Sequence, residues 1–202
     1  MTDVLIYGGG AVGLGIASCL LASGARVDII AREDTVTSLR ANGLLRTGLF
    51  GDFHAAADTF ECHTSLDECQ TGPYDFVLVC TKSFDSAAAA ADLATQRDAL
   101  GAEAKIVLLQ NGWGNAEVFC GHFEPQRVYS GRVITGFQRH RSHEVEITVH
   151  ADAIHIGTLF SGDVAALAPL CRAIEQGGIP CERTDNVGKD LWAKMLYNCA
   201  LN

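Results

Sequence analysis

Three glycines near the N-terminus have the spacing of a loop that binds the phosphates of a dinucleotide. Gly8, Gly10 and Gly13 satisfy the pattern G-x-G-x-x-G, and the whole loop consists of Gly8, Gly9, Gly10, Ala11, Val12 and Gly13. The first glycine permits a tight turn, the second lets the backbone approach a pyrophosphate, and the third lets a helix pack closely on a strand. A helix that begins here directs free N–H groups and the positive end of its dipole at the phosphates. The loop therefore predicts an anion site that needs no basic side chain.

The sequence on both sides of this loop decides between a phosphate site and a flexible glycine turn, because the pattern alone is a weak signal. Residues 4–7 form a short apolar run that predicts a strand, residues 14–23 have helical spacing, and residues 27–31 form a second apolar run. A strand, a loop, a helix and a strand at these distances make the βαβ unit that binds dinucleotides. The context favours dinucleotide binding.

The residue that follows the second predicted strand indicates which dinucleotide is bound. An acidic side chain there would accept hydrogen bonds from a ribose 2′-OH and repel a 2′-phosphate, but this chain has Arg32. A guanidinium can form two parallel hydrogen bonds with a phosphate and can stack on adenine. Arg32 therefore favours NADP(H). Because Glu33 and Asp34 follow directly, NAD stays open, as does the interpretation of Arg32 as a solvated surface charge.

Polar residues also follow two later apolar runs. Thr81 and Lys82 come after residues 76–80, and Gln110, Asn111 and Gly112 come after residues 106–109. The carboxyl ends of parallel strands form the edge at which open α/β sheets bind ligands. The alternatives are a surface lysine at position 82 and a plain turn at positions 111–112.

A lysine and two amides recur at helical spacing near the C-terminal end of the chain. Lys194, Asn198 and Asn202 are four residues apart, so a helix turning about 100° per residue places them along one slowly drifting face. A polar stripe on an otherwise apolar helix indicates a lined cavity, and a solvated helix face is the alternative.

The chain resembles the ketopantoate reductases, also called 2-dehydropantoate 2-reductases. The resemblance rests on five features that follow one another in this order: the glycine loop, the strand-end arginine, Thr81-Lys82, Gln110-Asn111-Gly112 and the helix motif W-x-K-x-x-x-N-x-x-x-N at positions 192–202. The resemblance covers essentially the whole chain, but only the glycine loop and the helix motif are specific. It implies NADPH-dependent reduction of 2-dehydropantoate to pantoate, the step that supplies pantothenate for coenzyme A.

The resemblance also implies roles for the residues that would hold the cofactor. The glycine loop would bind the pyrophosphate and Arg32 the adenosine 2′-phosphate, while Lys82 would bind the cofactor nearby. Asn111 would lie beside both the nicotinamide and the substrate.

On the terminal helix, the resemblance makes Lys194 the catalytic lysine, and Asn198 and Asn202 the amides that bind the substrate's hydroxyl or carbonyl groups. Hydride delivery to a ketone carbon builds negative charge on oxygen, and an ammonium beside that oxygen can stabilise the charge and donate the proton. The family's second, helical domain supplies further substrate contacts, including an acidic residue and a serine, and this chain ends before them. We therefore expect a chain that can bind NADP(H) without necessarily turning over substrate.

The elements that must position these residues alternate between strand and helix. Apolar runs at 4–7, 27–31, 76–80, 106–109 and 128–134 predict buried parallel strands, and helical spacing recurs at 14–23, 84–97 and 164–176. Residues 44–57 predict a hairpin insertion, and the period-two alternation at 145–157 predicts antiparallel strands at a sheet edge. The fold class is thus α/β, a Rossmann-type doubly wound, mainly parallel sheet with an antiparallel edge.

The predicted domains follow from the last helix, which opens at Asp185 or Asn186 and lacks a stop signal before the final residue. Residues 1–184 form the NADP(H)-binding domain, and residues 185–202 begin a helical substrate domain that is incomplete.

Composition narrows the class of partner. The formal net charge of −9 over 202 residues gives no general attraction to nucleic acid or to an anionic membrane. There is no secretion signal, and no apolar run reaches the ~18 residues of a membrane span. We therefore expect a soluble, cytoplasmic protein whose partner is a small 2-keto acid, and a homodimer stays open as its assembly.

The cysteines and histidines predict neither disulfides nor a metal site. The eight cysteines include no C-x-x-C pair and lie in apolar segments, which is typical of buried free thiols. His140 and His143 are three residues apart, but Arg139 and Arg141 surround them, and neighbouring cations disfavour a metal ion.

Three other functions stay open at this point. The chain could belong to a paralogous reductase of another small 2-keto acid, to a non-catalytic NADP(H)-binding module, or to a β-hydroxyacid dehydrogenase that uses NAD in the oxidative direction. Fold and motif do not separate the first of these from a ketopantoate reductase.

Overall fold

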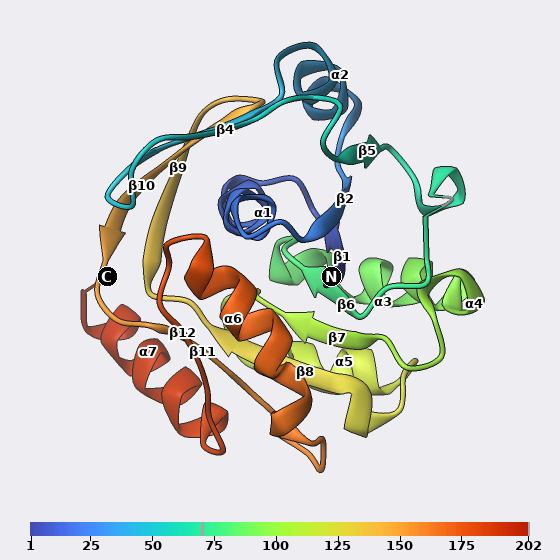
Figure 1. Ribbon diagram of the computed structural model, residues 1–202. Coiled ribbons are helices and arrows are strands. Elements are labelled where there is room, and N and C mark those ends of the chain that lie inside the picture. The colour runs from blue at the N-terminus through green and yellow to red at the C-terminus, as the bar shows by residue number, and fades with distance from the viewer. Residues whose placement is uncertain (70, 202) are drawn as a thin grey trace.

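The computed structural model describes residues 1–69 and 71–201, without the side chain of Leu201, and within them the strands form two sheets. The eight-stranded main sheet has the order β12-β11-β8-β7-β6-β1-β2-β5 (Figure 1). Its strands are β1 (Asp3–Tyr7), β2 (Arg26–Ile30), β5 (Glu61–His63), β6 (Phe76–Val79), β7 (Lys105–Leu108), β8 (Val128–Arg132), β11 (Ile154–Gly157) and β12 (Cys181–Arg183). From β5 to β8 every pair is parallel, whereas β11 runs antiparallel to β8. The predicted fold class is confirmed.

Helices cover both faces of the main sheet because its strands bury side chains in both directions. Val4 and Ile6 of β1 belong to one hydrophobic core, and Leu5 between them belongs to the other. The first core lies under α1 (Ala11–Ala22) and α6 (Ala168–Gln176), and the second under α3 (Ser86–Thr95) and α5 (Asn115–Cys120). Alternation at period two on a doubly covered sheet explains why these strands are apolar throughout.

The other helical segments are short, apart from α2 (Glu33–Asn42), which follows β2. The predicted helix at 84–97 is divided into the 3-10 turn η2 (Ser83–Asp85), α3 and α4 (Arg97–Leu100). Further 3-10 turns are η1 (Leu66–Glu68), η3 (Pro125–Arg127) and η4 (Val164–Leu167), the last of which leads into α6.

The second sheet was not predicted as a separate unit. It has the order β4-β3-β10-β9 and contains β3 (Leu44–Gly48), β4 (Phe53–Ala55), β9 (Thr135–Arg141) and β10 (Glu144–His150). The hairpin predicted at 44–57 is present as the antiparallel pair β3–β4. The prediction that residues 145–157 extend the main sheet is right for β11 but wrong for β10, which pairs in parallel with β3. The reason is that the buried side chains of β10, Val145 and Ile147, join the core around α1.

Helix α1 is enclosed between the two sheets, as the curve of β4, β10 and β9 around it shows (Figure 1). Every residue from Gly13 to Leu20 is buried, so the helix has no solvated face along this stretch. Small residues permit the close contacts: a Cβ at Gly15 would lie 2.3 Å from the ring of Phe137 in β9, and one at Gly177 would lie 2.1 Å from the Cys19 carbonyl oxygen. An apolar helix buried all round is expected only where it has neighbours on every side.

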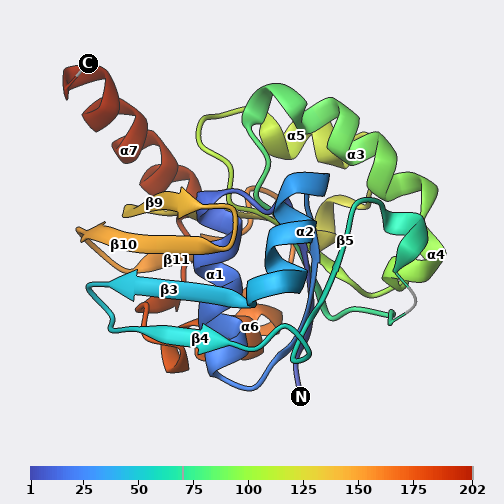
Figure 2. The ribbon, with the colours of Figure 1, turned by 90° about the horizontal axis from the view of Figure 1, so that it is seen from above.

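Helix α7 (Val187–Leu201) begins one or two residues after the predicted start and packs on β8 and β11. Val187 and Leu191 are buried, and His155 Nδ1 of β11 lies 2.9 Å from Asp190 Oδ2. Beyond this base the helix projects past the sheets (Figure 2).

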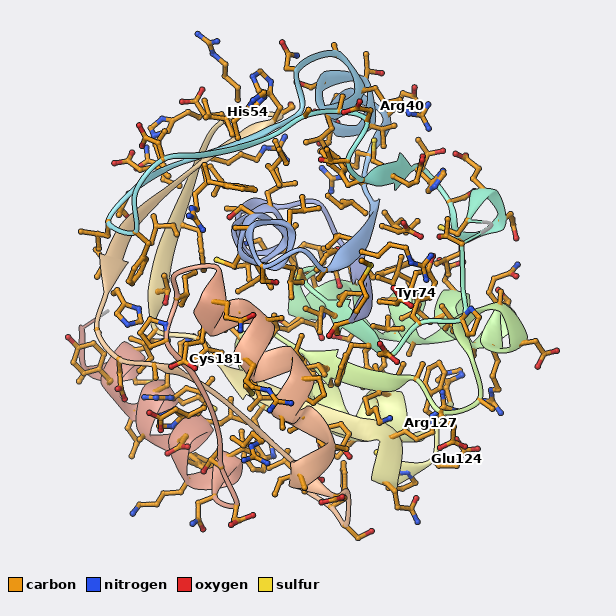
Figure 3. The ribbon with its side chains drawn as sticks, in the orientation of Figure 1. Arg40, His54, Tyr74, Glu124, Arg127 and Cys181 are labelled. Carbon is orange, nitrogen blue, oxygen red and sulfur yellow. The ribbon has the colours of Figure 1, made fainter. Side chains whose placement is uncertain are left out.

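The cysteine prediction is confirmed in part. All eight thiols are free. Cys19, Cys62, Cys171 and Cys181 are buried, and Cys181 lies against α6 (Figure 3). The prediction is wrong for Cys199, which is exposed on the projecting part of α7. Over residues 1–69 and 71–201, no helix combines the length and apolar character that crossing a bilayer requires.

The contact between Gly15 and Phe137 predicts the effect of adding one methyl group to α1. We expect Gly15→Ala to lower the free energy of unfolding by about 1–2 kcal/mol, because an overpacking cost of about 1–3 kcal/mol exceeds the gain in helix propensity of up to about 1 kcal/mol. Urea denaturation measures this change.

A double-mutant cycle separates the clash from other effects of the methyl group. In a Phe137→Leu background, Gly15→Ala should cost less than it does in the wild type, because the ring atoms that meet the new Cβ are gone. Equal costs in the two backgrounds would show that the second sheet does not press on α1.

Candidate functional site

The glycine loop connects β1 to α1. A side chain at Gly8 or Gly13 would collide with neighbouring backbone, and a side chain at Gly10 would fill the open space in front of α1. Gly8 has a positive φ of 118°, and a Cβ there would lie 2.9 Å from the backbone nitrogen of Thr81. A Cβ at Gly13 would lie 2.0 Å from the Gly8 carbonyl oxygen, so only glycine lets α1 approach the loop this closely. Gly10, the N-cap of α1, has open space where a Cβ would be. The first turn of α1 thus opens onto a surface that a phosphate can reach.

A cavity of about 440 Å³ lies in front of this loop, at the carboxyl ends of β1, β2 and β6. It is lined by Tyr7, Gly8, Gly9, Gly10, Ile30, Ala31, Arg32, Asp34, Thr35, Thr64, Cys80, Thr81, Lys82, Asp85 and Arg139. The structure therefore brings Arg32 and Lys82 together with the glycine loop, as the sequence predicts. Ala11, Val12 and Gly13 lie just behind the lining, in the first turn of α1.

The acidic residues after Arg32 differ in their surroundings. Glu33 Oε1 accepts a hydrogen bond from Thr37 Oγ1 within α2 and does not line the cavity. Asp34 does line it, but its Oδ2 accepts a hydrogen bond from Ser142 Oγ at 3.2 Å and lies 3.6 Å from Arg139 Nη2. Of the two carboxylates that kept NAD open, the one that lines the cavity is thus paired with a cation.

Arg139 is a cavity residue that the sequence analysis did not assign to the site. It lies on β9 of the second sheet, and its Nη1 donates a 3.0 Å hydrogen bond to the carbonyl oxygen of Gly9. In the sequence it is one of several basic residues near 139–141 and follows no motif. Only the folding of the second sheet over α1 places it at the glycine loop.

Lys194 and Asn111 meet although 83 residues separate them in the sequence. Lys194 Nζ donates to Asn111 Oδ1 and to the Val133 carbonyl oxygen, each at 2.5 Å. Asn111 follows β7 and Val133 follows β8, so the packing of α7 on β8 places the ammonium at the carboxyl ends of these strands. Trp192 of the same helix contacts Trp113 with ring centroids 5.4 Å apart, which fixes α7 against the loop after β7.

The environment of Lys194 disfavours its charged form. Burial lowers the pKa of the ammonium, and the positive charge of Arg132 lowers it further. Arg132 is itself buried at the end of β8, where its Nη2 donates to Asp152 Oδ2 at 2.8 Å and to the Ala153 carbonyl oxygen at 3.0 Å. Its Nε has no hydrogen-bond partner among the residues that the structure describes.

A buried amide network connects the two parts of the site. Gln110 Nε2 donates to Ser86 Oγ at 3.0 Å and to Thr81 Oγ1 at 3.1 Å. Ser86 Oγ donates to Asn115 Oδ1, whose own Nδ2 donates to the Asn111 carbonyl oxygen at 3.2 Å. The network therefore fixes the backbone that carries Asn111 relative to the end of β6. The sequence analysis did not find Ser86 or Asn115, because a single serine or asparagine has no pattern that marks it.

Two further amides, Asn198 and Asn202, were predicted to bind the substrate. Asn198 is exposed, one turn beyond Lys194 on α7. Asn202 lies outside the described residues. Their predicted contacts with substrate stay predictions.

These side chains can perform two kinds of chemistry. The loop, the helix N-terminus, Arg32, Lys82 and Arg139 can bind phosphate groups, and an ammonium with a lowered pKa can stabilise and protonate a developing oxyanion. Among the described residues, no group of three or more His, Cys, Asp or Glu side chains could hold a metal ion.

The chain is similar to known proteins in sequence. A family model described as ketopantoate reductase PanE/ApbA matches residues 4–160. A 2-dehydropantoate 2-reductase of Aquifex aeolicus is 31% identical over 200 residues, which are 98% of this chain and 60% of that protein.

The chain is also similar in fold to solved structures of such proteins. A 2-dehydropantoate 2-reductase from Geobacter metallireducens has a TM-score of 0.85 at 28% identity, covering 97% of this chain and 62% of that one. A PanE/ApbA family ketopantoate reductase from Ralstonia eutropha has a TM-score of 0.81 at 30% identity, with coverages of 98% and 62%. The chain thus spans less than two thirds of the length of these relatives.

The surroundings of Lys194 predict how its titration responds to a neighbouring charge. We expect Arg132→Met to raise the pKa of Lys194, because the ammonium loses a like charge while it stays buried. A side-chain NMR titration of Lys194 measures the change. Arg141→Met, which removes an exposed arginine from β9, is the matched control and should leave the titration unchanged; an unchanged or lower pKa in Arg132→Met would contradict the prediction.

Proposed function

The chain belongs to the ketopantoate reductase PanE/ApbA family, and from this premise we propose that it forms the cofactor-binding part of an NADPH-dependent reductase that converts 2-dehydropantoate to pantoate and so supplies pantothenate synthesis. The observation that carries the proposal is the position of Lys194. Its ammonium lies against Asn111, which follows β7. Strand β7 pairs with β6, and Thr81 and Lys82 at the end of β6 line the cavity in front of the glycine loop.

The residues of the cavity fit a dinucleotide phosphate. Gly10 leaves space at the N-terminus of α1, and Arg32 and Lys82 add positive charge to the lining. NADPH, when bound, supplies the hydride. The loop and α1 would hold the pyrophosphate, Arg32 the 2′-phosphate, and Asn111 would orient the nicotinamide and the substrate carbonyl.

Lys194 provides the proton in this mechanism. As the ketone carbon receives the hydride, negative charge grows on the carbonyl oxygen, and the ammonium stabilises it and transfers a proton from Nζ. The lowered pKa of Lys194 makes this transfer easier than from an exposed lysine. Because only the protonated form donates, the rate of reduction should fall as the pH rises through the pKa of Lys194, which lies below the usual value of about 10.4.

We also propose the division of the chain that the sequence predicts, with residues 1–184 as the NADP(H)-binding domain and residues 185–202 as the start of a helical substrate domain. The exposed Trp192, Leu196 and Tyr197 on α7 support this division, because a further helical layer would cover them. Asn198 would then face the substrate from α7, and Asn202 is proposed to bind the substrate with it.

Lys194→Ala tests the proposed role of the ammonium. In the complete natural protein we expect kcat with ketopantoate to fall by about 10²–10⁴-fold, the usual contribution of a general acid, while NADPH affinity changes little. NADPH oxidation and fluorescence titration measure the two quantities. Lys189→Ala, which removes an exposed lysine from the same helix, is the control.

The outcomes of this assay distinguish the alternatives. Turnover of another 2-keto acid but not of ketopantoate would replace the substrate while keeping the reductase. Unchanged turnover in Lys194→Ala would contradict the assignment of the proton donor, and NADPH binding without turnover of any 2-keto acid would indicate a binding module.

Arg32→Ala tests the choice of cofactor. We expect NADPH to bind about 10–100-fold more weakly, because a charge-assisted hydrogen bond contributes about 1.5–3 kcal/mol, while NADH affinity changes far less. Fluorescence titration of the 202-residue chain measures both, since the cavity lies within it. Equal weakening of the two cofactors would contradict the 2′-phosphate role.

A further inference from the structure

We propose that Arg139 is a second residue that selects the cofactor, and that it forms with Arg32 a two-arginine site for a phosphate monoester on the adenosine ribose. This inference rests on the proposed use of NADP(H), which it deepens. The sequence and the family pattern assign the 2′-phosphate to Arg32 alone, whereas the structure adds a second guanidinium, from β9 of the other sheet, to the lining of the same cavity.

The position of Arg139 is set by its contact with the glycine loop. Its Nη1 donates to the Gly9 carbonyl oxygen at 3.0 Å, and it shares the cavity lining with Gly9, Ala31 and Arg32. In a βαβ dinucleotide site the adenosine ribose lies between the glycine loop and the end of the second strand. In this chain Gly9 and Ala31 mark the glycine loop and the end of the second strand. Arg139 therefore lies beside the expected position of a 2′-phosphate.

The contact with Asp34 explains how this end of the cavity accepts an anion. An acidic side chain after the second strand repels a 2′-phosphate. Here Asp34 Oδ2 lies 3.6 Å from Arg139 Nη2, and both side chains bond to Ser142 Oγ, at 3.2 and 3.1 Å. The charge of Arg139 therefore offsets that of the nearest carboxylate, which would otherwise repel a phosphate.

The guanidinium has the capacity to bind a further anion. It carries five N–H donors in a planar fork, and its hydrogen bonds to Gly9 and Ser142 do not use all of them. About a third of its side chain is exposed, since the relative accessibility is 30%. A planar fork of this kind matches the oxygen atoms of a phosphate.

The alternative is that Arg139 only supports the loop through Gly9. That role would act on every adenosine ligand alike, whereas a phosphate contact would act only on ligands with a 2′-phosphate. The pair 2′,5′-ADP and 5′-AMP isolates the difference, because the two ligands differ by that one group.

The experiment is calorimetric titration of the 202-residue chain and its variants with 2′,5′-ADP and with 5′-AMP. Wild-type protein should prefer 2′,5′-ADP. Arg139→Met should weaken 2′,5′-ADP about 10-fold or more, the effect of losing a charge-assisted contact, and change 5′-AMP less than about 2-fold. Arg139→Lys, which keeps the charge but not the fork, should have a preference between those of wild type and Arg139→Met.

A matched control lies on the same strand. Arg141 is 74% exposed and pairs with Glu144 at 3.8 Å, so Arg141→Met removes the same charge from β9 without touching the cavity lining. It should leave both affinities unchanged.

Two results would overturn the inference: equal weakening of both ligands by Arg139→Met, which would indicate loop support alone, or an equal loss of 2′,5′-ADP affinity in Arg141→Met, which would indicate a general charge effect. Failure of the proposed function is a different result. If wild-type protein does not prefer 2′,5′-ADP, the NADP(H) assignment itself is wrong, and if Arg32→Ala leaves that preference intact, the assignment of Arg32 to the 2′-phosphate is wrong.

Discussion

The burial of α1 on all sides is the constraint on which the rest of the structure depends. Its residues from Gly13 to Leu20 have no solvated face, because the main sheet lies on one side and the second sheet wraps the other. A helix held in this way cannot shift without disturbing the core that it shares with the main sheet and the second sheet. Since the proposed anion site is the N-terminus of α1, the packing that stabilises the fold also fixes the direction of the N–H groups at that site. Within α1, Gly13 and Gly15 are positions at which an added Cβ would collide with its surroundings.

The sequence predicts the parts of the site whose signals are local. The loop at residues 8–13, the helix after it and Arg32 lie within one βαβ unit, and their spacing alone defines the geometry. The second sheet is different. The alternation at 145–149 shows that one face of a strand is buried, but it does not say against what. The parallel pairing of β10 with β3 joins segments about a hundred residues apart, so no window of sequence contains it. Arg139 was missed for the same reason.

The ammonium site depends on several weak local signals that only the fold combines. The spacing of Lys194 and Asn198 predicts a polar stripe, yet the same stripe on a free helix would be solvated. Whether Lys194 is solvated or lies at the strand ends depends on how α7 packs. The contacts of Trp192 with Trp113 and of Asp190 with His155 hold α7 against the strand ends. The lowering of the Lys194 pKa then follows from the burial of the ammonium and from the charge of Arg132, neither of which is visible as a motif.

The anchoring of α7 at its base gives the helix the mechanics of a lever. Val187, Asp190 and Leu191 fix one end to the sheet, and Leu196 and Tyr197 lie exposed toward the other. Because an α-helix is stiff and rises about 1.5 Å per residue, a force on the exposed end is transmitted to the base rather than absorbed along the way. Lys194 lies between the anchored base of the helix and its exposed end. Any body that presses on Leu196 and Tyr197 therefore sets the tilt of the helix, and with it the alignment of the ammonium with Asn111.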